Sequence, residues 1–159
     1  MLLALALLLS AAAPHCPAKG AAAPRFNLPL ARGGRISLSD LLIKKRATLV
    51  SFWRYDCKPC VAELPALQKL VGEWGDKVSA LAIHVGGPEE KMLAFLDEKH
   101  LLLSAAFDQT EKVSHDRFCV DALPRLFVLD SKGAVAATLA GEQPDFEKAL
   151  RAIVEPLLH

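Results

Sequence analysis

Residues 48–60 read TLVSFWRYDCKPC. The run over residues 48–53 is apolar and rich in β-branched and aromatic side chains, which is typical of a central strand covered on both faces. Over residues 59–74 the apolar side chains recur every three or four positions, which predicts a helix with one buried face. Cys57 and Cys60 therefore stand where a buried strand passes into a helix.

The spacing of these two cysteines indicates a role for each. Cys57 lies at or beside the helix N-terminus, where unpaired N–H groups and the helix macrodipole favour the thiolate that attacks disulfides. Lowering a thiol pKa from ~8.5 to ~7 takes about 2 kcal/mol, and a helix terminus supplies ~0.3 to 1 kcal/mol, or up to ~2 when partly buried. Cys60 follows one helical turn later on the same side, where it can resolve a mixed disulfide.

The rest of the chain alternates strands and helices. Two hairpins are expected, one joining residues 26–28 to 35–37 through Gly33 and Gly34, the other turning at residues 131–133. Further strands are predicted over residues 78–85, 105–107, 126–130 and 135–140, and further helices over residues 38–42, 89–99, 111–118 and 145–158. This order favours an α/β domain with a mixed sheet and helices on both of its faces.

Composition assigns these elements to one domain. The chain has 159 residues, of which 52% are hydrophobic, enough for a single core and too few for two ordinary domains. The formal net charge of +1 gives no long-range field of the kind that gathers nucleic acid. No nucleic-acid partner is therefore expected.

Residues 1–13 read MLLALALLLSAAA, an apolar run followed by small residues that is typical of a secretory signal. The run is shorter than the ~18 to 20 apolar residues needed to cross a bilayer. Cleavage after Ala13 and cleavage after Ala23 both stay open. The predicted organisation is a signal peptide with a flexible lead-in over residues 1–23 and one domain over residues 24–159, exported to a periplasmic or other extracytoplasmic space where disulfides form.

Three stretches carry a family resemblance: FNLPLARGGRISLSDL (residues 26–41), TLVSFWRYDCKPCVAELPALQKL (residues 48–70) and ALPRLFVLDSKGAV (residues 122–135). They resemble the TlpA-like or ResA-like branch of extracytoplasmic thioredoxins, which are relatives of the AhpC/TSA group. The resemblance runs from about Phe26 to Leu158. It implies a thioredoxin fold with an N-terminal β-hairpin and a central βα insertion, and a thiol-disulfide oxidoreductase activity.

The resemblance also implies roles for single residues. Cys57 and Cys60 match the family's redox-active disulfide, with Cys57 as nucleophile. Pro124 matches the family's cis-proline, which with Leu123 and Trp53 implies a substrate-binding surface facing the disulfide. Glu63 matches a glutamate near the redox pair, and one turn beyond Cys60 its carboxylate could exchange protons with that thiol.

Two residues depart from the family pattern. Asp56 stands where the family usually has Trp, and Arg125 where it usually has Thr. Both place a charge beside the docking surface, and the Asp56 carboxylate opposes a thiolate at Cys57 unless it turns away to cap the helix. The substrate preference of other members therefore does not transfer to this chain.

The partners implied are protein thiols and disulfides together with an upstream membrane electron donor. We expect a monomer that acts as a reductase, for example in cytochrome c maturation, with no cofactor and no metal. A peroxiredoxin-like peroxidase is one alternative, but it needs Thr or Ser three residues before the nucleophile, where this chain has Arg54. A copper-binding thioredoxin-fold module using Cys57, Cys60 and a histidine is the other, since thiolates suit Cu(I).

The remaining cysteines and histidines give weaker evidence about function. Cys119 is most simply a small buried apolar residue. Cys16 is open to two further interpretations, a lipid anchor, which Pro14 and His15 fit poorly, and a disulfide with Cys119. Three histidines without metal-ligand spacing are assigned ordinary surface or core roles, namely His84, His100 and His115.

Overall fold

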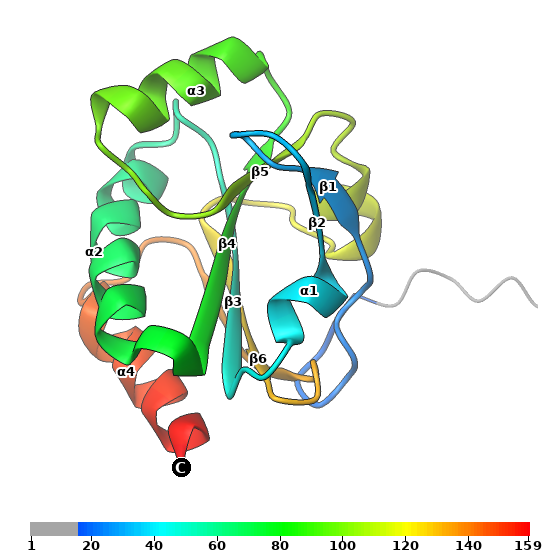
Figure 1. Cartoon of the computed structure of the whole chain (residues 1–159), viewed down its shortest axis with the longest axis vertical. Coiled ribbons are helices and arrows are strands. Elements are labelled where there is room, and N and C mark those ends of the chain that lie inside the picture. The colour runs from blue at the N-terminus through cyan, green and yellow to red at the C-terminus, as the bar shows by residue number, and fades with distance from the viewer. Residues whose placement is uncertain (1–15) are drawn as a thin grey trace, which may run out of the picture.

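A five-stranded mixed sheet forms the centre of the protein (Figure 1). The computed structural model describes residues 16–159, so the predicted secretory signal over residues 1–13 lies outside the described residues. The strands follow the order β5-β4-β3-β6-β7. Strands β5, β4 and β3 run parallel to one another, whereas β6 runs antiparallel to both of its neighbours, β3 and β7. Their bounds are β3 Ala47–Trp53, β4 Val78–Val85, β5 Ala105–Asp108, β6 Arg125–Asp130 and β7 Val135–Ala140.

The central strand β3 is buried over its whole length, and its side chains alternate between two apolar layers. Leu49 packs into the layer beneath α2 (Lys58–Trp74) and α4 (Phe146–Val154). Val50 and Phe52 point to the opposite layer. Figure 1 shows α2 and α4 on one side of the sheet and α1 on the other, which confirms the predicted arrangement.

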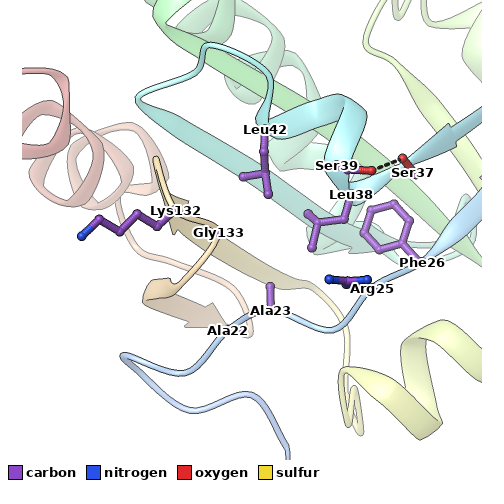
Figure 2. A pocket seen from close by; sticks show the side chains of 10 residues that line it. All are labelled: Ala22, Ala23, Arg25, Phe26, Ser37, Leu38, Ser39, Leu42, Lys132 and Gly133. Atoms are coloured by element: carbon purple, nitrogen blue, oxygen red, sulfur yellow. Dashed lines mark hydrogen bonds between the residues drawn. The ribbon is translucent and has the colours of Figure 1, made fainter.

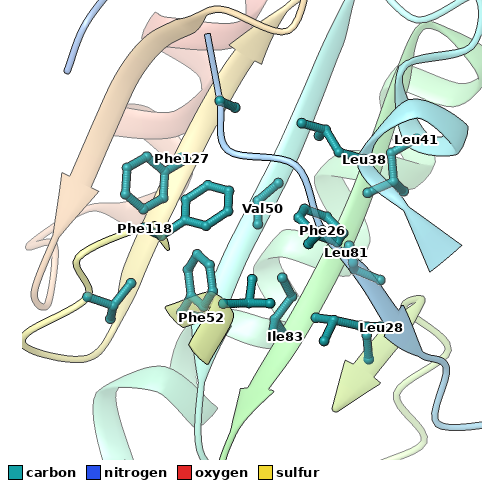
Figure 3. Packing of buried hydrophobic residues seen from close by; sticks show 14 of the residues in the cluster. Phe26, Leu28, Leu38, Leu41, Val50, Phe52, Leu81, Ile83, Phe118 and Phe127 are labelled. Atoms are coloured by element: carbon teal, nitrogen blue, oxygen red, sulfur yellow. The ribbon is translucent and has the colours of Figure 1, made fainter. Parts of the chain in front are cut away.

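The second face is covered by α1 (Leu38–Leu42) and by a hairpin of β1 (Asn27–Pro29) and β2 (Arg35–Ser37). Phenylalanine rings fill the space beneath them (Figure 3). The ring of Phe118 lies 5.0 Å from that of Phe52 and 5.1 Å from that of Phe127, measured between centroids. Aromatic contacts therefore join the sheet to the loop that precedes β6.

The middle of the chain supplies the predicted insertion, α3 (Glu89–Glu98) and β5, at one edge of the sheet. The helix expected over residues 111–118 is a π-helix, η2 (Lys112–Arg117), followed by a backbone hydrogen bond from Phe118 to Val113. A turn of 3-10 helix, η1 (Gly75–Lys77), follows α2.

The last helix is shorter than predicted. It ends at Val154 and passes into a 3-10 turn, η3 (Glu155–Leu158). Pro156 explains the change, because proline has no N–H to donate to the carbonyl of Ala152.

The described part of the predicted lead-in is attached to the domain. Gly20 N–H donates to Val135 O at 2.8 Å, and Ala23 N–H donates to Gly133 O at 2.9 Å. Ala22 forms an isolated bridge with Ala134. Residues 20–23 therefore add to the final hairpin rather than forming a free segment. Within residues 16–159, no helix has both the length and the apolar character of a membrane span.

Candidate active site

Cys57 and Cys60 form a disulfide where β3 meets α2. Cys57 is the N-cap of α2, and its Sγ lies 3.4 Å from the backbone nitrogen of Cys60, which donates to it. Pro59 occupies the first turn, where its missing N–H has no partner to lose. The helix therefore begins at the disulfide, and its positive end faces the Cys57 sulfur.

The two cysteines differ in exposure. Cys57 is half-buried, whereas Cys60 is 2% exposed and belongs to an apolar cluster that includes Leu64 and Met92. An approaching disulfide therefore meets Cys57 before Cys60. This is the asymmetry that a nucleophile and a resolving thiol require.

The loop before β6 lies at the same end of the sheet. The Leu123–Pro124 peptide bond is cis, and Arg125 pairs with Phe52, one residue before the end of β3. Leu123 is half-buried and packs against the cluster that also contains Cys60. The register of β6 against β3 thus places Leu123 and Pro124 at the same end of the sheet as the disulfide.

Trp53 supports this region from inside. Its side chain is 1% exposed, and its ring lies 5.6 Å from Phe95 between centroids. Its Nε1 has no hydrogen-bond partner among the described residues. Direct contact between Trp53 and a client protein would require this side chain to become exposed.

Glu63 lies on α2 one turn after Cys60 and is half-buried. Burial raises the pKa of Glu63 to about 7, a backbone hydrogen bond from Gln143 opposes the rise, and the charge of Glu142 adds to it. Its Oε1 is buried without a hydrogen-bond partner among the described residues. The carboxyl group can therefore both hold and release a proton near neutral pH.

The two charges that depart from the family pattern are each paired within the chain. Arg54 donates to both carboxylate oxygens of Asp56, at 2.9 and 3.0 Å, and this hydrogen bonding lowers the pKa of Asp56. Arg125 forms an ion pair with Asp121. Asp56 thus bonds to Arg54 and does not cap α2, and neither charge stands alone beside the disulfide.

His84, which the sequence assigned an ordinary surface or core role, is buried in the core next to the redox segment. His84 pairs with Trp53 in the sheet, and its Nε2 accepts a hydrogen bond from the backbone N–H of Tyr55 at 3.2 Å. A signal was present, because His84 is the single ionisable residue in VSALAIHV, an otherwise apolar or small strand.

The prediction that Cys119 is merely a small buried residue is wrong. Cys119 forms a disulfide with Cys16, and the two are separated by 103 positions in the sequence. Cys119 adopts a left-handed backbone conformation, with φ 51°, between η2 and the cis-proline loop. The sequence left a lipid anchor and a disulfide open for Cys16, and the structure contains the disulfide.

Among the described residues, no three or more His, Cys, Asp or Glu side chains are grouped so that they could hold a metal ion. A cavity of about 520 Å³ lies between α1 and the β6–β7 turn and is lined in part by Arg25, Leu42 and Gly133 (Figure 2). The turn lies at the opposite end of β3 from the disulfide, because Asp130 pairs with Ala47. This cavity is therefore not part of the redox site.

The fold and the Cys57–Cys60 pair define a thioredoxin-like thiol-disulfide oxidoreductase. The AhpC/TSA family profile matches residues 19–138. The chain therefore belongs to the AhpC/TSA family, which confirms the resemblance.

Named relatives agree with this class. The chain is 33% identical over 120 residues to the thioredoxin-like protein YneN of Bacillus subtilis, covering 74% of this chain and 68% of YneN. It is 30% identical over 125 residues to the thiol-disulfide oxidoreductase ResA of Bacillus cereus, covering 78% of this chain and 70% of ResA.

Solved structures agree on the fold. A putative thioredoxin from Neisseria meningitidis matches with a TM-score of 0.73 and 28% identity, covering 85% of this chain and 88% of that one. A putative thiol:disulfide interchange protein DsbE from Chlorobium tepidum matches with a TM-score of 0.75 and 24% identity, covering 90% of this chain and 99% of that one.

Proposed function

We propose that this chain is an exported oxidoreductase that reduces disulfides of other proteins, with Cys57 as nucleophile and Cys60 as resolving cysteine. The observation that carries the proposal is the Cys57–Cys60 disulfide at the N-terminus of α2, with Cys57 the more exposed of the two. The relatives named thioredoxin-like protein and thiol-disulfide oxidoreductase support the same chemistry.

The reaction starts from the reduced pair. The Cys57 thiolate attacks one sulfur of a client disulfide, a Cys57–client bond forms, and the other client sulfur leaves as a thiolate and takes up a proton. The Cys60 thiolate then attacks Cys57 Sγ, the Cys57–client bond breaks, and the second client sulfur leaves and is protonated. Two electrons and two protons thus pass to the client, and the Cys57–Cys60 disulfide is restored.

The start of α2 supports the first step. The N–H of Cys60 already donates to Cys57 Sγ across 3.4 Å in the oxidised pair. The same N–H and the helix macrodipole would stabilise a negative sulfur once the disulfide is opened. Because Asp56 is paired with Arg54, its carboxylate opposes the thiolate less than a free carboxylate would.

Glu63 is proposed to serve the second step. Cys60 is buried and must lose its proton before it can attack, so a nearby base is needed. A carboxyl group one turn away on the same helix, with a pKa raised by burial to about 7, suits that transfer near neutral pH.

The loop of Leu123 and Pro124 is proposed to bind the client. Proline cannot donate an N–H, so a client strand beside it would bond to the backbone of Leu123. Trp53 is proposed to support this surface from within the core, since its side chain is buried. We further propose a monomer in an extracytoplasmic space, re-reduced by a membrane electron donor and used in cytochrome c maturation or a similar delivery of electrons.

Reduction of insulin disulfides with dithiothreitol as electron source tests the proposal. The native chain should accelerate the reaction, and Cys57→Ser should return it to the uncatalysed rate. Cys60→Ser should accumulate a mixed disulfide with insulin, because the resolving thiol is missing. The double variant Cys16→Ser/Cys119→Ser is the matched control, since it removes two cysteines and leaves the redox pair in place.

Alkylation separates the roles of the two thiols. In the reduced protein, iodoacetamide should modify Cys57 at least about tenfold faster than Cys60 below pH 8, because Cys57 is the exposed thiolate. Peptide mass spectrometry reads both sites. Equal, slow modification of Cys57 and Cys60 would contradict the assignment of nucleophile and resolving cysteine.

A further inference from the structure

His84 bonds to the backbone through both ring nitrogens. It is fully buried near the end of β4. Nε2 lies 3.2 Å from the backbone nitrogen of Tyr55, and Nδ1 lies 2.9 Å from the carbonyl oxygen of Gly86. The ring therefore links the turn before the disulfide to the turn that follows β4.

The two hydrogen-bond partners determine which ring nitrogen of His84 carries the proton. The Tyr55 N–H can only donate, so Nε2 must accept and carries no hydrogen. The Gly86 carbonyl can only accept, so Nδ1 must carry the hydrogen. Burial lowers the pKa of His84 to about 4, and the charge of Arg54 lowers it further, against the Gly86 hydrogen bond and the charge of Asp56. At pH 7 His84 is thus the neutral Nδ1–H tautomer.

We propose that His84 is a positioning residue of the redox site, which holds the turn from Arg54 to Cys57 in place through the Tyr55 N–H. This inference rests on the proposed function of Cys57 as nucleophile. Cys57 N–H donates to Arg54 O at 3.2 Å, so these residues form a closed turn with Tyr55 inside it. Holding Tyr55 therefore fixes the segment that delivers Cys57 to the start of α2.

The Tyr55 ring gives an independent second contact. It stacks on the His84 ring with 5.3 Å between centroids and an interplanar angle of 8°. Trp53 meets the same ring edge-on at 4.9 Å. The imidazole is therefore held between aromatic rings from the redox segment, and its orientation is set by packing as well as by hydrogen bonds.

The turn after β4 supplies the second hydrogen-bond partner of His84, the Gly86 carbonyl. Gly86 and Gly87 have φ values of +58° and +74°, which glycine adopts without strain and which turn the chain back toward His84. A Cβ on Gly87 would lie 3.8 Å from His84 Cε1 and 3.9 Å from Tyr55 Cε1. These are ordinary van der Waals distances, so glycine is favoured at both positions by the positive φ, and the resulting turn lets Gly86 present its carbonyl to Nδ1.

The tautomer is tested on the native oxidised protein by ¹⁵N NMR at pH 7. The expected spectrum has a protonated Nδ1 and an unprotonated Nε2 for His84, and a Tyr55 amide protected from exchange. An Nε2–H tautomer, or an imidazolium, would overturn the proposal. This readout does not require turnover, so it remains decisive if the native chain fails to reduce insulin.

Two variants test the effect on Cys57. His84→Phe keeps a ring beneath Tyr55 but removes the acceptor, and should slow the reaction of reduced Cys57 with a small aromatic disulfide by about tenfold. His84→Gln retains an amide oxygen able to accept from Tyr55 N–H and should slow this reaction less than His84→Phe does. The Tyr55 amide should exchange faster in His84→Phe than in His84→Gln.

Urea unfolding of both variants separates positioning from folding. A merely structural role would lower the free energy of unfolding and leave the rate at Cys57, and its pH dependence, at native values. That result would overturn the proposal. If His84→Phe does not fold, the tautomer of the native protein and the rate of His84→Gln still decide it.

Discussion

Glu63, one helical turn after Cys60 in α2, has a carboxyl group held partly out of water. Burial raises its pKa from 4.5 to about 7 in the folded chain. The folded state therefore holds the proton more tightly than the unfolded state does. Its contribution to stability is complete below pH 4.5 and is lost as the pH rises through about 7.

Replacing Glu63 with glutamine should remove this pH dependence. Relative to the native protein, Glu63→Gln is expected to gain about 1 kcal/mol of unfolding free energy between pH 4.5 and pH 8, a figure reduced because the group is half-exposed. Urea unfolding of the oxidised proteins at several pH values measures it. A constant difference between the two proteins over this range would contradict the raised pKa.

The β6–β7 hairpin depends on one glycine at its turn. Gly133 has φ +79°, and a Cβ built there would lie 2.8 Å from Leu42 Cδ1. The Asp130 carboxylate accepts hydrogen bonds from the N–H groups of Lys132 and Ala134, at 2.8 and 3.0 Å. The turn is thus fixed from within, and the Leu42 side chain of α1 leaves little room for a side chain at Gly133; both residues are labelled in Figure 2.

Two alanine variants separate backbone strain from steric contact at this hairpin. Gly141 also has a positive φ, +70°, but has open space around its Cβ position. Gly141→Ala should cost about 1 kcal/mol of unfolding free energy from backbone strain alone. Gly133→Ala should cost about 1 kcal/mol more, because Leu42 must move. Equal losses in urea unfolding would show that Leu42 moves aside freely.

The regular elements could be predicted because their signals are local. The strand over residues 78–85 and the hairpin strand over residues 135–140 have the predicted bounds, since an apolar run or a turn residue marks each end. The π-helical form of residues 112–117 could not be predicted. Within it, Ser114 N–H donates to the Asp108 carboxylate at 2.7 Å, a side-chain contact that hydrophobic periodicity does not reveal.

Without the family resemblance, which also supplied Leu123 and Pro124, the site could be predicted only where sequence neighbours make it. Cys57 and Cys60 are three positions apart, so the geometry of the helix fixes the relative positions of their side chains. The contact of His84 with Tyr55 spans 29 positions and depends on the register of β3 against β4. The pairing of Cys16 with Cys119 spans 103 positions, over which spacing carries no information about distance.

At the scale of the whole molecule, the Cys16–Cys119 disulfide ties the N-terminal segment to the loop that leads into the cis-proline. A bond that closes so long a loop restricts the unfolded chain strongly. Residues 20–23, which follow Cys16, are also paired with the final hairpin. The N-terminal segment is therefore held to the domain in two places, by the disulfide at Cys119 and by hydrogen bonds to the β6–β7 hairpin.

Removing this bond should destabilise the protein without changing the redox pair. The double variant Cys16→Ser/Cys119→Ser is expected to lose about 2 to 4 kcal/mol of unfolding free energy. Cys16→Ser and Cys119→Ser should each lose nearly the same amount, because either one breaks the bond. Urea unfolding without reductant measures all three, and losses that add up across the single variants would contradict a shared bond.

The same bond gives the two predicted signal-cleavage positions different structural consequences. Release of residues 1–13 would leave Cys16 in the chain, whereas release of residues 1–23 would remove Cys16 together with residues 20–23, which pair with the final hairpin. In the second case Cys119 would be a free thiol in a molecule whose other thiols exchange partners. If the predicted signal is removed, the position of the cut would therefore determine whether the chain keeps the Cys16–Cys119 cross-link.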